Sequence, residues 1–478
     1  MPSGNIQPTE PLKMESHSYD VTVIGAGPGG YVAAIRAAQE GKSVAIIERE
    51  ALGGVCLNWG CIPTKALLKS AEHYGFLKKA SDWGFETGEI SVDWQKVISR
   101  SREAAEKLSG GIGFLMKKNR ITVHSGSARY LSANRIEVSS AEGETIEIQT
   151  THSIIATGAR AGSIPGVEID NERVITSREA MVLPQCPESL AIIGAGAIGV
   201  EFAYFYASFG CKVTLLEYLP AVLPASDADI SRTLEKSFKR QGIDIHTDAR
   251  VLSVDRDGDR VSTTFEKEGQ STTVETDAVL VAVGVLGNTE NLGLEELGLE
   301  LENGFVAVDG HCETSVRGVY AIGDVNGPPA LAHVASFEGI HVLRHMADRE
   351  IEPIDYTLVP SCVYCQPQVA SVGLTEAEAK EKGLEVSCGK FPFAASGKAV
   401  ATAETDGFVK IIADKDSGEI IGAHIIGSEA TELIAELALG KSAELGVEDL
   451  HLAIHAHPTL SEAVMEAAAD ATGKATHI

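Results

Sequence analysis

The sequence predicts an α/β protein with two parallel-sheet modules and a C-terminal α+β domain. Three observations predict this fold class. The chain has 478 residues, which is too many for one hydrophobic core. A strand, a glycine-rich turn, a helix and a second strand follow one another twice, in residues 20–48 and in residues 190–217. From residue 355 onward the pattern changes to short strands and one long helix, without another turn of this kind.

The two glycine-rich segments are copies of one plan. In each copy a glutamate ends the pattern 23 positions after the first glycine, and the copies lie 169 residues apart. The first glycine allows a tight turn, the second lets backbone amides approach a pyrophosphate, and the third lets the helix pack close to the strand. These glycines are Gly25, Gly27 and Gly30 in the first copy and Gly194, Gly196 and Gly199 in the second. Two copies in register predict two Rossmann-like dinucleotide-binding modules.

The glutamates that end the two patterns, Glu48 and Glu217, carry information about the nucleotide. A carboxylate at this position accepts hydrogen bonds from the ribose hydroxyls. It repels a 2′-phosphate, which normally requires an arginine there. Glu217 therefore favours NAD over NADP in the second module.

Three further apolar segments, residues 153–160, 278–288 and 319–324, read as strands that close the modules. Later strands at 361–365, 368–374 and 408–414 and a helix at 431–444 indicate the separate C-terminal domain. The predicted parts are a disordered extension (1–18), the first module (19–160), the second module (161–285), a second part of the first, central module (286–354) and the α+β domain (355–478).

A pair of cysteines follows the first strand–turn–helix–strand pattern, residues 20–48, directly. Cys56 and Cys61 stand in the run GGVCLNWGCIPTKALL. Two thiols can accept two electrons from another dithiol by exchange. Because Pro63 and good helix formers follow, we expect Cys61 at a helix N-terminus, where the backbone dipole favours a thiolate. The placement predicts a redox-active disulfide, and the alternative is two buried, reduced cysteines that fill space.

Composition restricts the partners and the compartment. The formal net charge is −27, which argues against nucleic acid and anionic membranes as partners. A basic protein partner stays possible, although we favour solubility as the reason for the acidity. Eight scattered cysteines form no secreted disulfide framework, so we expect a reducing, cytoplasmic location with one special pair. No segment supplies about 20 uninterrupted apolar residues, as a membrane span requires.

Together these landmarks resemble the pyridine nucleotide-disulphide oxidoreductases over residues 19–478. The specific marks are GGVCLNWGCIPTKALL, the second fingerprint GAGAIGVEFA, YAIGD and the C-terminal HAHPTLSE. The resemblance implies that the first module binds FAD, that the second binds NAD, and that the C-terminal domain joins a homodimer. It is strongest to members that oxidise protein-bound dihydrolipoamide, with a lipoyl domain and an acyltransferase core of a 2-oxoacid dehydrogenase or glycine cleavage complex as partners.

The resemblance also implies roles around the cofactors. Asp324 would bond the ribityl chain of FAD, and Lys65 would lie beside the reactive flavin nitrogen, paired with Glu201. A buried cation there stabilises the anionic reduced flavin and needs a carboxylate partner, whereas the alternative for Lys65 is a solvated helix lysine. Glu48 would hold the adenosine ribose of FAD and Glu217 that of NAD. Further FAD contacts implied are Ala128, Thr157, Gly158, Ala330, Leu331, Ala332 and His333, and further NAD contacts are Glu201, Val251 and Gly284.

His457 and Glu462 resemble the catalytic base of the family and the carboxylate that orients it. A dithiol is mostly protonated at neutral pH, so its attack on a disulfide requires a base. A histidine paired with a carboxylate is suited to this task. The spacing of five residues requires a turn around Pro458 rather than a helix. The neighbouring His455 is expected to be structural, and a metal site at this His-x-His is disfavoured because no further ligand follows at a suitable spacing.

Several positions depart from the family pattern. Residues 284–289 read GVLGNT where relatives often read GRxPNT, so Val285 and Gly287 replace an arginine and a proline. Val334 replaces a common lysine. Cys362 and Cys365 form a C-x2-C where relatives commonly have a threonine; a zinc site needs a second pair, so we interpret them as small strand residues.

By analogy, His457 of one subunit takes a proton from dihydrolipoamide, the thiolate attacks Cys56, and Cys61 leaves as a thiolate that passes electrons through FAD to NAD. The alternatives are other flavin disulfide reductases, namely glutathione-type, mercuric and large thioredoxin reductases, or a non-catalytic docking subunit. Glu217 argues against the NADP-linked enzymes, and the tail ATGKATHI lacks additional redox cysteines. The intact cysteines, Lys65 and His457 argue against a subunit without activity.

Overall fold

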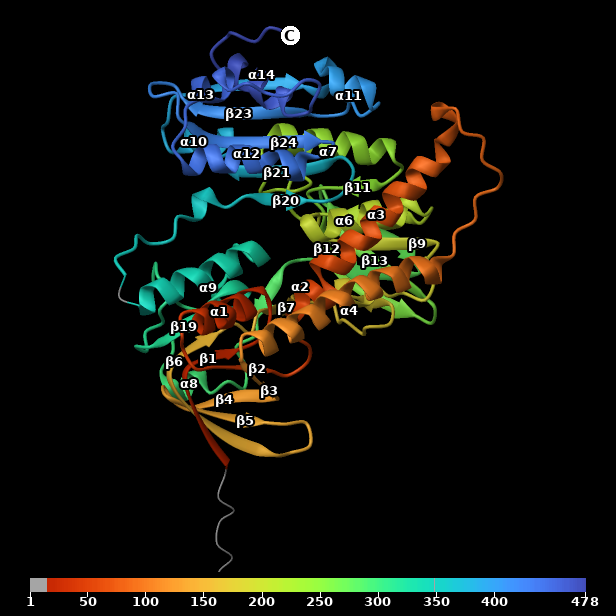
Figure 1. Cartoon of the computed structure of the whole chain (residues 1–478). Coiled ribbons are helices and arrows are strands. Elements are labelled where there is room, and N and C mark those ends of the chain that lie inside the picture. The colour runs from red at the N-terminus through yellow and green to blue at the C-terminus, as the bar shows by residue number, and fades with distance from the viewer. Residues whose placement is uncertain (1–14, 348) are drawn as a thin grey trace, which may run out of the picture. The chain divides into compact units, whose positions relative to one another are not determined.

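The computed structural model describes residues 15–347 and 349–478. They form two compact units (Figure 1). Unit 1 holds the chain up to Asn58 together with Ala105–Arg160 and Leu286–Ile354, and unit 2 holds Trp59–Ala104, Ala161–Val285 and Asp355–Ile478. The chain passes between the units within α2 (Gly54–Trp59), α4 (Trp94–Lys118), β7 (Ala159–Ala161) and β16 (Val285–Gly287). Among the described residues, no helix is long and apolar enough to cross a membrane.

Unit 1 is built on a seven-stranded sheet with the order β3-β2-β1-β6-β5-β4, in which β19 also pairs with β6. The strands β3, β2, β1, β6 and β19 are parallel, whereas β5 and β4 are antiparallel. The strands are β1 (Glu15–Ile24), β2 (Val44–Glu48), β3 (Thr122–Ser125), β4 (Ser127–Ser132), β5 (Arg135–Ser139), β6 (Thr145–Ile155) and β19 (Val319–Ala321). The other elements are α1 (Pro28–Gln39), α8 (Leu294–Leu297), β17 (Leu301–Glu302), β18 (Phe305–Val306), η2 (Gly323–Asn326) and α9 (Ala332–Met346).

The first predicted module is therefore present as β1, α1 and β2. Pro28 begins α1, where its missing amide costs no helical hydrogen bond. Figure 1 shows α1 and α9 side by side against the sheet. Their close approach requires glycine, because a Cβ on Gly339 of α9 would lie 3.0 Å from the carbonyl oxygen of Gly29. This packing fixes the helix that follows the first glycine-rich turn.

The predicted disordered extension is corrected in part. Residues 1–14 lie outside the described residues. Glu15–Ser18 are the first four residues of β1 and pair with residues 146–149 of β6. The ladder uses backbone groups, so polar side chains do not prevent strand formation where a partner strand is long enough to pair. Because that partner comes about 130 positions later, the local sequence gave no sign of it.

Unit 2 contains the second predicted module. Its parallel sheet has the order β11-β10-β9-β15-β8. The elements are β8 (Val174–Ile175), α5 (Ser177–Ala180), β9 (Ser189–Ile193), α6 (Ala197–Ser208), β10 (Lys212–Leu216), α7 (Ala228–Arg240), β11 (Asp244–His246) and β15 (Ala278–Val281). An antiparallel meander follows β11, made of β12 (Arg250–Asp257), β13 (Arg260–Lys267) and β14 (Gln270–Thr276). The same unit also holds α3 (Cys61–Lys78) and η1 (Ala80–Trp83).

The rest of unit 2 is the predicted α+β domain. Five antiparallel strands have the order β20-β21-β24-β23-β22. They are β20 (Ser361–Val363), β21 (Gln368–Gly373), β22 (Val386–Pro392), β23 (Phe408–Asp414) and β24 (Ile420–Gly427). The helical elements are η3 (Tyr356–Leu358), α10 (Glu376–Glu381), η4 (Phe393–Ala395), α11 (Gly397–Ala401), α12 (Ala430–Ser442), α13 (Val447–Leu452) and α14 (Glu462–Asp470). The strands and the helix predicted for this domain are confirmed, with β23 at its predicted bounds.

A buried ion cluster joins the second module to this domain inside unit 2. Lys410 of β23 lies 3.0 Å from both carboxylate oxygens of Asp227, the N-cap residue of α7, and 2.8 Å from Glu376 Oε2. Asp227 and Lys410 are only 2% and 4% exposed. Burial alone lowers the pKa of Lys410, but its hydrogen bonds to Glu376 and Asp227 outweigh burial and raise the pKa above its ordinary value.

We expect Lys410→Met to lower the free energy of unfolding by about 3–5 kcal/mol, because it leaves the buried carboxylate of Asp227 without its cation. The measurement is denaturant unfolding of the purified protein. Lys415→Met is the matched control, since Lys415 pairs with Glu385 at 3.0 Å on the surface and should cost less than about 1 kcal/mol. Equal losses in the two variants would contradict the assigned role of the buried cluster.

Candidate functional site

The first and third glycines of both fingerprints have backbone positions that only glycine fits. Gly25 and Gly194 have φ values of +103° and +102°, and a Cβ on either would lie 2.3 Å from a carbonyl oxygen, that of Ala156 or of Ala282. A Cβ on the third glycine of either copy would lie 1.9 Å from the carbonyl oxygen of the first. The two modules therefore repeat the same turn and the same helix-to-strand contact.

The second glycine of each fingerprint faces open space instead. A Cβ on Gly27 or Gly196 would meet no atom of the protein within 4 Å. Each turn thus leaves room on the side where the fingerprint predicts a pyrophosphate. Both α1 and α6 begin directly after this glycine, so the unpaired N–H groups of their first turns can face an anion there. In α1 these begin at Gly29, because Pro28 has no N–H.

The acidic residue of each module is anchored in the same way. One carboxylate oxygen of Glu48 accepts from the N–H of Ala26 (2.8 Å), and one oxygen of Glu217 accepts from the N–H of Ala195 (2.6 Å). The other oxygen accepts from the N–H two residues further along the chain in both cases. The carboxylates therefore lie at the fingerprint turn, where a ribose would be bound.

We expect Gly196→Ala to fold with an unchanged unfolding midpoint but to bind NAD about ten- to a hundredfold more weakly, because the new methyl group fills the space left for the pyrophosphate. Gly199→Ala is the matched comparison. Its Cβ would clash with backbone, so it should destabilise the protein by about 1–3 kcal/mol or more. The measurements are thermal unfolding and NAD titration. Wild-type NAD affinity in Gly196→Ala would remove this turn from the nucleotide site.

Within unit 1, several predicted FAD contacts gather near the carboxyl ends of the parallel strands. Thr157 and Gly158 follow β6, and Asp324 follows β19. Ala128 of β4 is buried in the same apolar cluster as Ile47 of β2. Burial, followed by the nearby carboxylate of Glu338, raises the pKa of Asp324. The remaining members, Ala330, Leu331, Ala332 and His333, lie at the N-terminus of α9, where Leu331 is the N-cap residue.

Two departures from the family pattern, Gly287 and Val334, have local explanations in unit 1, and the neighbouring Asn288, which matches the pattern, holds this segment in place. Asn288 locks the segment around Thr157: its Nδ2 donates to the Thr157 carbonyl (2.9 Å), and the Thr157 hydroxyl donates to the Asn288 carbonyl (2.7 Å). A Cβ at Gly287 would lie 2.9 Å from the carbonyl oxygen of Gly304, so a larger residue would not fit. Val334 is 4% exposed on α9, where an apolar side chain suits its surroundings better than a lysine.

The remaining predicted NAD contacts lie in unit 2. Gly284 follows β15 with φ +112°, and its carbonyl accepts from the N–H of Gly162 (2.9 Å). Val251 of β12 packs against a cluster that contains Leu216, the residue before Glu217. Both therefore lie on elements that border the second fingerprint.

The two cysteines occupy two helices. Cys56 is in the short α2, and Cys61 is the first residue of α3, after the N-cap residue Gly60. The predicted placement of Cys61 at a helix N-terminus is confirmed. Both residues are half-buried. The redox role of the pair stays a prediction.

One turn after Cys61, Lys65 pairs with Glu201 of α6 within unit 2. Lys65 Nζ lies 3.0 Å from both carboxylate oxygens of Glu201, which is 5% exposed. Glu201 Oε1 also accepts from the N–H of Tyr364 at 3.0 Å. The predicted partners thus lie together, and the arrangement is that of an anchored ion pair rather than of a solvated helix lysine.

His457 and Glu462 also lie together. The Nδ1 atom of His457 is 2.9 Å from Glu462 Oε1, and Glu462 Oε2 accepts from the N–H of Thr459 at 2.8 Å. Burial raises the pKa of Glu462, but the hydrogen bonds from Thr459 and His457 outweigh it and leave the pKa below its ordinary value. The side chain of His457 is 78% exposed. The turn lies at Pro458, before α14 begins at Glu462.

His455 and the cysteine pair Cys362 and Cys365 have surroundings that suit a structural role. His455 has a side chain only 7% exposed, and its Nε2 lies 2.8 Å from Glu436 Oε1. Burial raises the pKa of Cys362 to about 11 and that of the fully buried Cys365 further, so both thiols stay protonated. Among the described residues, no group of three or more potential ligands could hold a metal ion.

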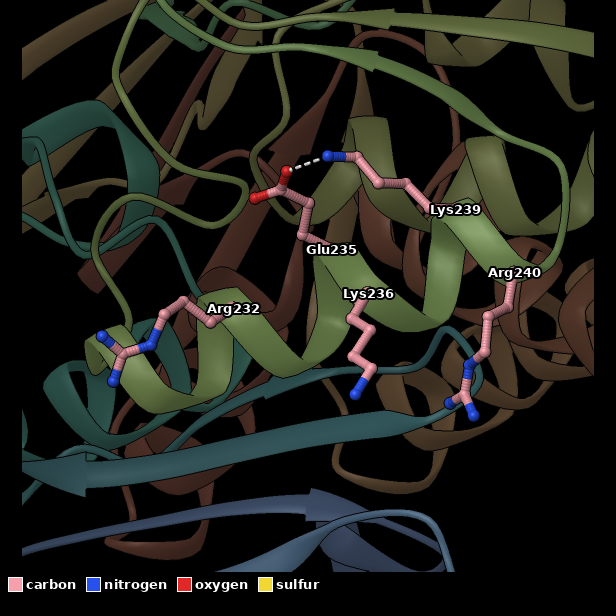
Figure 2. A pocket seen from close by; sticks show the side chains of 5 residues that line it. All are labelled: Arg232, Glu235, Lys236, Lys239 and Arg240. Carbon is pink, nitrogen blue, oxygen red and sulfur yellow. Dashed lines mark hydrogen bonds and ion pairs between the residues drawn. The ribbon is translucent and has the colours of Figure 1, made fainter.

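A hollow of about 550 Å³ lies on the solvent side of α7 and is lined only by charged side chains (Figure 2). In Figure 2, Glu235 and Lys239 point toward one another on one side of the helix, and Lys236 and Arg240 project from the other. None of the site residues predicted from the sequence lines it. The hollow is therefore no guide to the chemistry of the fingerprints and the cysteines.

Comparison with known proteins assigns the chain to a family. Residues 19–339 match the family model described as pyridine nucleotide-disulphide oxidoreductase, and residues 359–468 match the dimerisation domain of that family. The chain belongs to this family. The second match supports a homodimer, in accordance with the exposed apolar side chains of Leu452 and Ile454 beside the His457 turn.

Relatives of this oxidoreductase cover nearly its whole length. A protein of Rhizobium etli named dihydrolipoyl dehydrogenase is 45% identical over 96% of this chain and 99% of its own. A protein of Bacillus subtilis with the same name is also 45% identical, over 96% and 99% of the two chains. The crystal structure of LpdA from Mycobacterium tuberculosis matches with a TM-score of 0.88 at 30% identity, covering 94% of this chain and 99% of that one.

The cofactors of this pyridine nucleotide-disulphide oxidoreductase are FAD and NAD. The residues present fit them, since each module has an open fingerprint turn with an anchored carboxylate beside it. Its fold class is as predicted, with FAD-binding, NAD-binding and dimerisation domains. The chain is therefore an NAD-dependent flavoprotein oxidoreductase.

Sequence reasoning missed two residues that shape this oxidoreductase site. Tyr364 contacts Lys65 and Glu201, and Asn288 holds Thr157. Both act through partners more than 130 positions away in the chain. Asn288 lies in the run GVLGNT and matches the family pattern there, but the run does not indicate its distant partner. The residues next to Tyr364 contain no motif that indicates a contact with the ion pair.

Proposed function

We propose that the chain oxidises protein-bound dihydrolipoamide to lipoamide with NAD as electron acceptor, as the homodimeric flavoprotein of a 2-oxoacid dehydrogenase or glycine cleavage complex in the cytoplasm. The observation that carries this proposal is the anchored Lys65–Glu201 pair one turn after Cys61 at a helix N-terminus. Relatives that are 45% identical over almost the whole chain are named dihydrolipoyl dehydrogenase, and this supports the substrate. The segments predicted for FAD, NAD and the subunit interface belong to the same proposal.

The proton is handled by His457 in this proposal. With Nδ1 bonded to Glu462, the neutral imidazole presents Nε2 as an acceptor for the proton of a substrate thiol. Glu462 stabilises the imidazolium that forms. In the dimer, His457 serves the cysteine pair of the partner subunit, so both chains are needed for one site.

The sulfur chemistry is handled by Cys56 and Cys61. The substrate thiolate attacks Cys56 of the oxidised pair, which breaks the Cys56–Cys61 bond and releases Cys61 as a thiolate stabilised at the N-terminus of α3. The second substrate thiol then displaces Cys56, which closes the lipoamide disulfide and leaves a reduced cysteine pair. Bound FAD supplies the chemistry that transfers the electron pair from this dithiol to NAD.

The nucleotide preference is proposed from Glu217. Its buried carboxylate, held by the amides of Ala195 and Leu219, is positioned to accept from a ribose diol and to repel a 2′-phosphate. This supports NAD and disfavours glutathione-type and other NADP-linked reductases.

The decisive experiment compares substrates and nucleotides on the purified holoenzyme. We expect rapid reduction of NAD by dihydrolipoamide, and slow or absent reaction with NADP or with the glutathione couple. Preference for glutathione and NADP would replace this proposal with a glutathione-type reductase. A flavin-containing dimer without activity toward any dithiol would support a docking subunit instead.

A further inference from the structure

The ion pair one turn after Cys61 has a third member, which comes from the C-terminal domain of unit 2. Tyr364 follows β20, in the loop between β20 and β21. Its backbone N–H donates to Glu201 Oε1 at 3.0 Å. Its ring centroid lies 4.5 Å from Lys65 Nζ. One residue thus contacts both partners of the pair, the anion through its backbone and the cation through its ring.

We propose that Tyr364 is the positioning residue that fixes the Lys65–Glu201 pair for the reaction. The kinetic consequence of this proposal rests on the proposed function, whereas the contacts of Tyr364 do not depend on it. A lysine has a long, flexible stem, so a carboxylate alone leaves its ammonium group several orientations. An aromatic face on another side of the ammonium group restricts those orientations and adds an electrostatic attraction of its own.

The backbone contact fixes the carboxylate as well. Glu201 Oε1 accepts from both Lys65 and Tyr364, whereas Oε2 accepts from Lys65. The N–H of Tyr364 therefore holds Glu201 Oε1 by a bond that does not depend on the lysine. Because Glu201 is 5% exposed, water contributes little to its solvation and these bonds are strong.

Burial on either side holds Tyr364 in place. Its chain neighbours Val363 and Cys365 are 5% and 0% exposed in the main apolar cluster of unit 2, against which Tyr364 itself packs. Such anchoring keeps the loop from moving away from Glu201. Tyr364 as a whole is half-buried, with its ring against the ammonium group.

The phenol takes no part as an acid or base. Burial, together with the nearby Cys362 and Glu201, raises the pKa of Tyr364 to about 12, so the hydroxyl stays protonated at neutral pH. The ring and the backbone amide carry the role. A phenylalanine at this position should therefore serve as well as the tyrosine.

The test uses the holoenzyme with Tyr364→Leu and Tyr364→Phe. Both variants keep the backbone amide, but only the leucine removes the ring. The first readout is the rate at which an amine-acylating reagent modifies Lys65, followed by peptide mass spectrometry, with the exposed Lys69 of the same helix as internal standard. We expect a rise of about three- to thirtyfold at Lys65 in Tyr364→Leu and none in Tyr364→Phe.

The second readout is turnover. Tyr364→Leu should lower kcat for dihydrolipoamide oxidation by a similar factor with an unchanged KM, and Tyr364→Phe should match the wild type. An unchanged acylation rate in Tyr364→Leu, or equal effects in both variants, would overturn the proposal. If Tyr364→Leu fails to fold, Tyr364→Met takes its place. If the wild type itself does not oxidise dihydrolipoamide, the proposed function fails, while the acylation rates still decide the role of Tyr364.

Discussion

His457→Gln should leave the fold and the flavin content intact and lower dihydrolipoamide turnover at least about a hundredfold. Glutamine can keep a hydrogen bond to Glu462, but it cannot take a proton from a thiol. The substrate would then attack only through the small fraction already ionised, because a thiol with an ordinary pKa is mostly protonated at neutral pH. The measurement is steady-state reduction of NAD by dihydrolipoamide.

Two controls make this result specific. His477→Gln changes a second exposed histidine in the same geometry, with Nδ1 2.8 Å from Glu466 Oε1, and should keep wild-type turnover. Oxidation of NADH by an artificial acceptor should persist in His457→Gln, since it needs no dithiol. Normal dihydrolipoamide turnover in His457→Gln would remove this residue from the mechanism.

Local geometry alone does not distinguish these two histidine–glutamate pairs. Both lie in the C-terminal region, both have an exposed ring and a bound Nδ1, and a hydrogen-bond distance does not separate them. His457 is distinguished by the turn at Pro458 in the segment HAHPTLSE that resembles the family. The assignment of the base therefore came from the sequence, and the structure added the orientation of its ring.

The parts of the fold that could be predicted are those fixed by neighbours in the chain. The third glycine of each fingerprint is required by a contact with the first glycine, five residues earlier, as between Gly199 and Gly194. The first glycine is an exception, because it is required by the distant carbonyl oxygen of Ala156 or Ala282 and was predicted from the motif instead. The start of α3 at Cys61 follows from Pro63 and the helix formers after it. Local requirements of this kind leave a pattern that one sequence can reveal.

The parts that could not be predicted depend on distant partners. Tyr364 meets Glu201 across 163 positions, and Lys410 meets Asp227 across 183. Nothing near Lys410 in FVKIIAD distinguishes a buried ion pair from the solvated edge of a strand. The pairing of Glu15–Ser18 with β6 belongs to the same class, since strand formation there was decided by the partner.

Cys56→Ser should abolish the oxidation of dihydrolipoamide, because a serine oxygen cannot form a disulfide with Cys61 and the substrate thiolate has no sulfur to attack. The same variant should still oxidise NADH with an artificial acceptor, since both fingerprint turns and their carboxylates are unchanged. The two activities measured on one preparation separate loss of the sulfur exchange from loss of the flavin. Thermal unfolding should be close to that of the wild type, because serine is nearly the same size as cysteine.

Cys388→Ser is the matched control, since it removes an exposed thiol of β22 that the proposed mechanism does not use. It should retain full activity toward dihydrolipoamide. Cys61→Ser should fail in the same assay as Cys56→Ser, because either change breaks the pair. If Cys56→Ser turned over dihydrolipoamide while Cys61→Ser did not, a single thiol would carry the reaction and the exchange between two cysteines would have to be abandoned. Loss of both activities in Cys56→Ser would instead mean that α2 supports the flavin site. This outcome can be measured separately, and it is relevant because Cys56 lies only a few residues after Glu48, which ends the first fingerprint pattern.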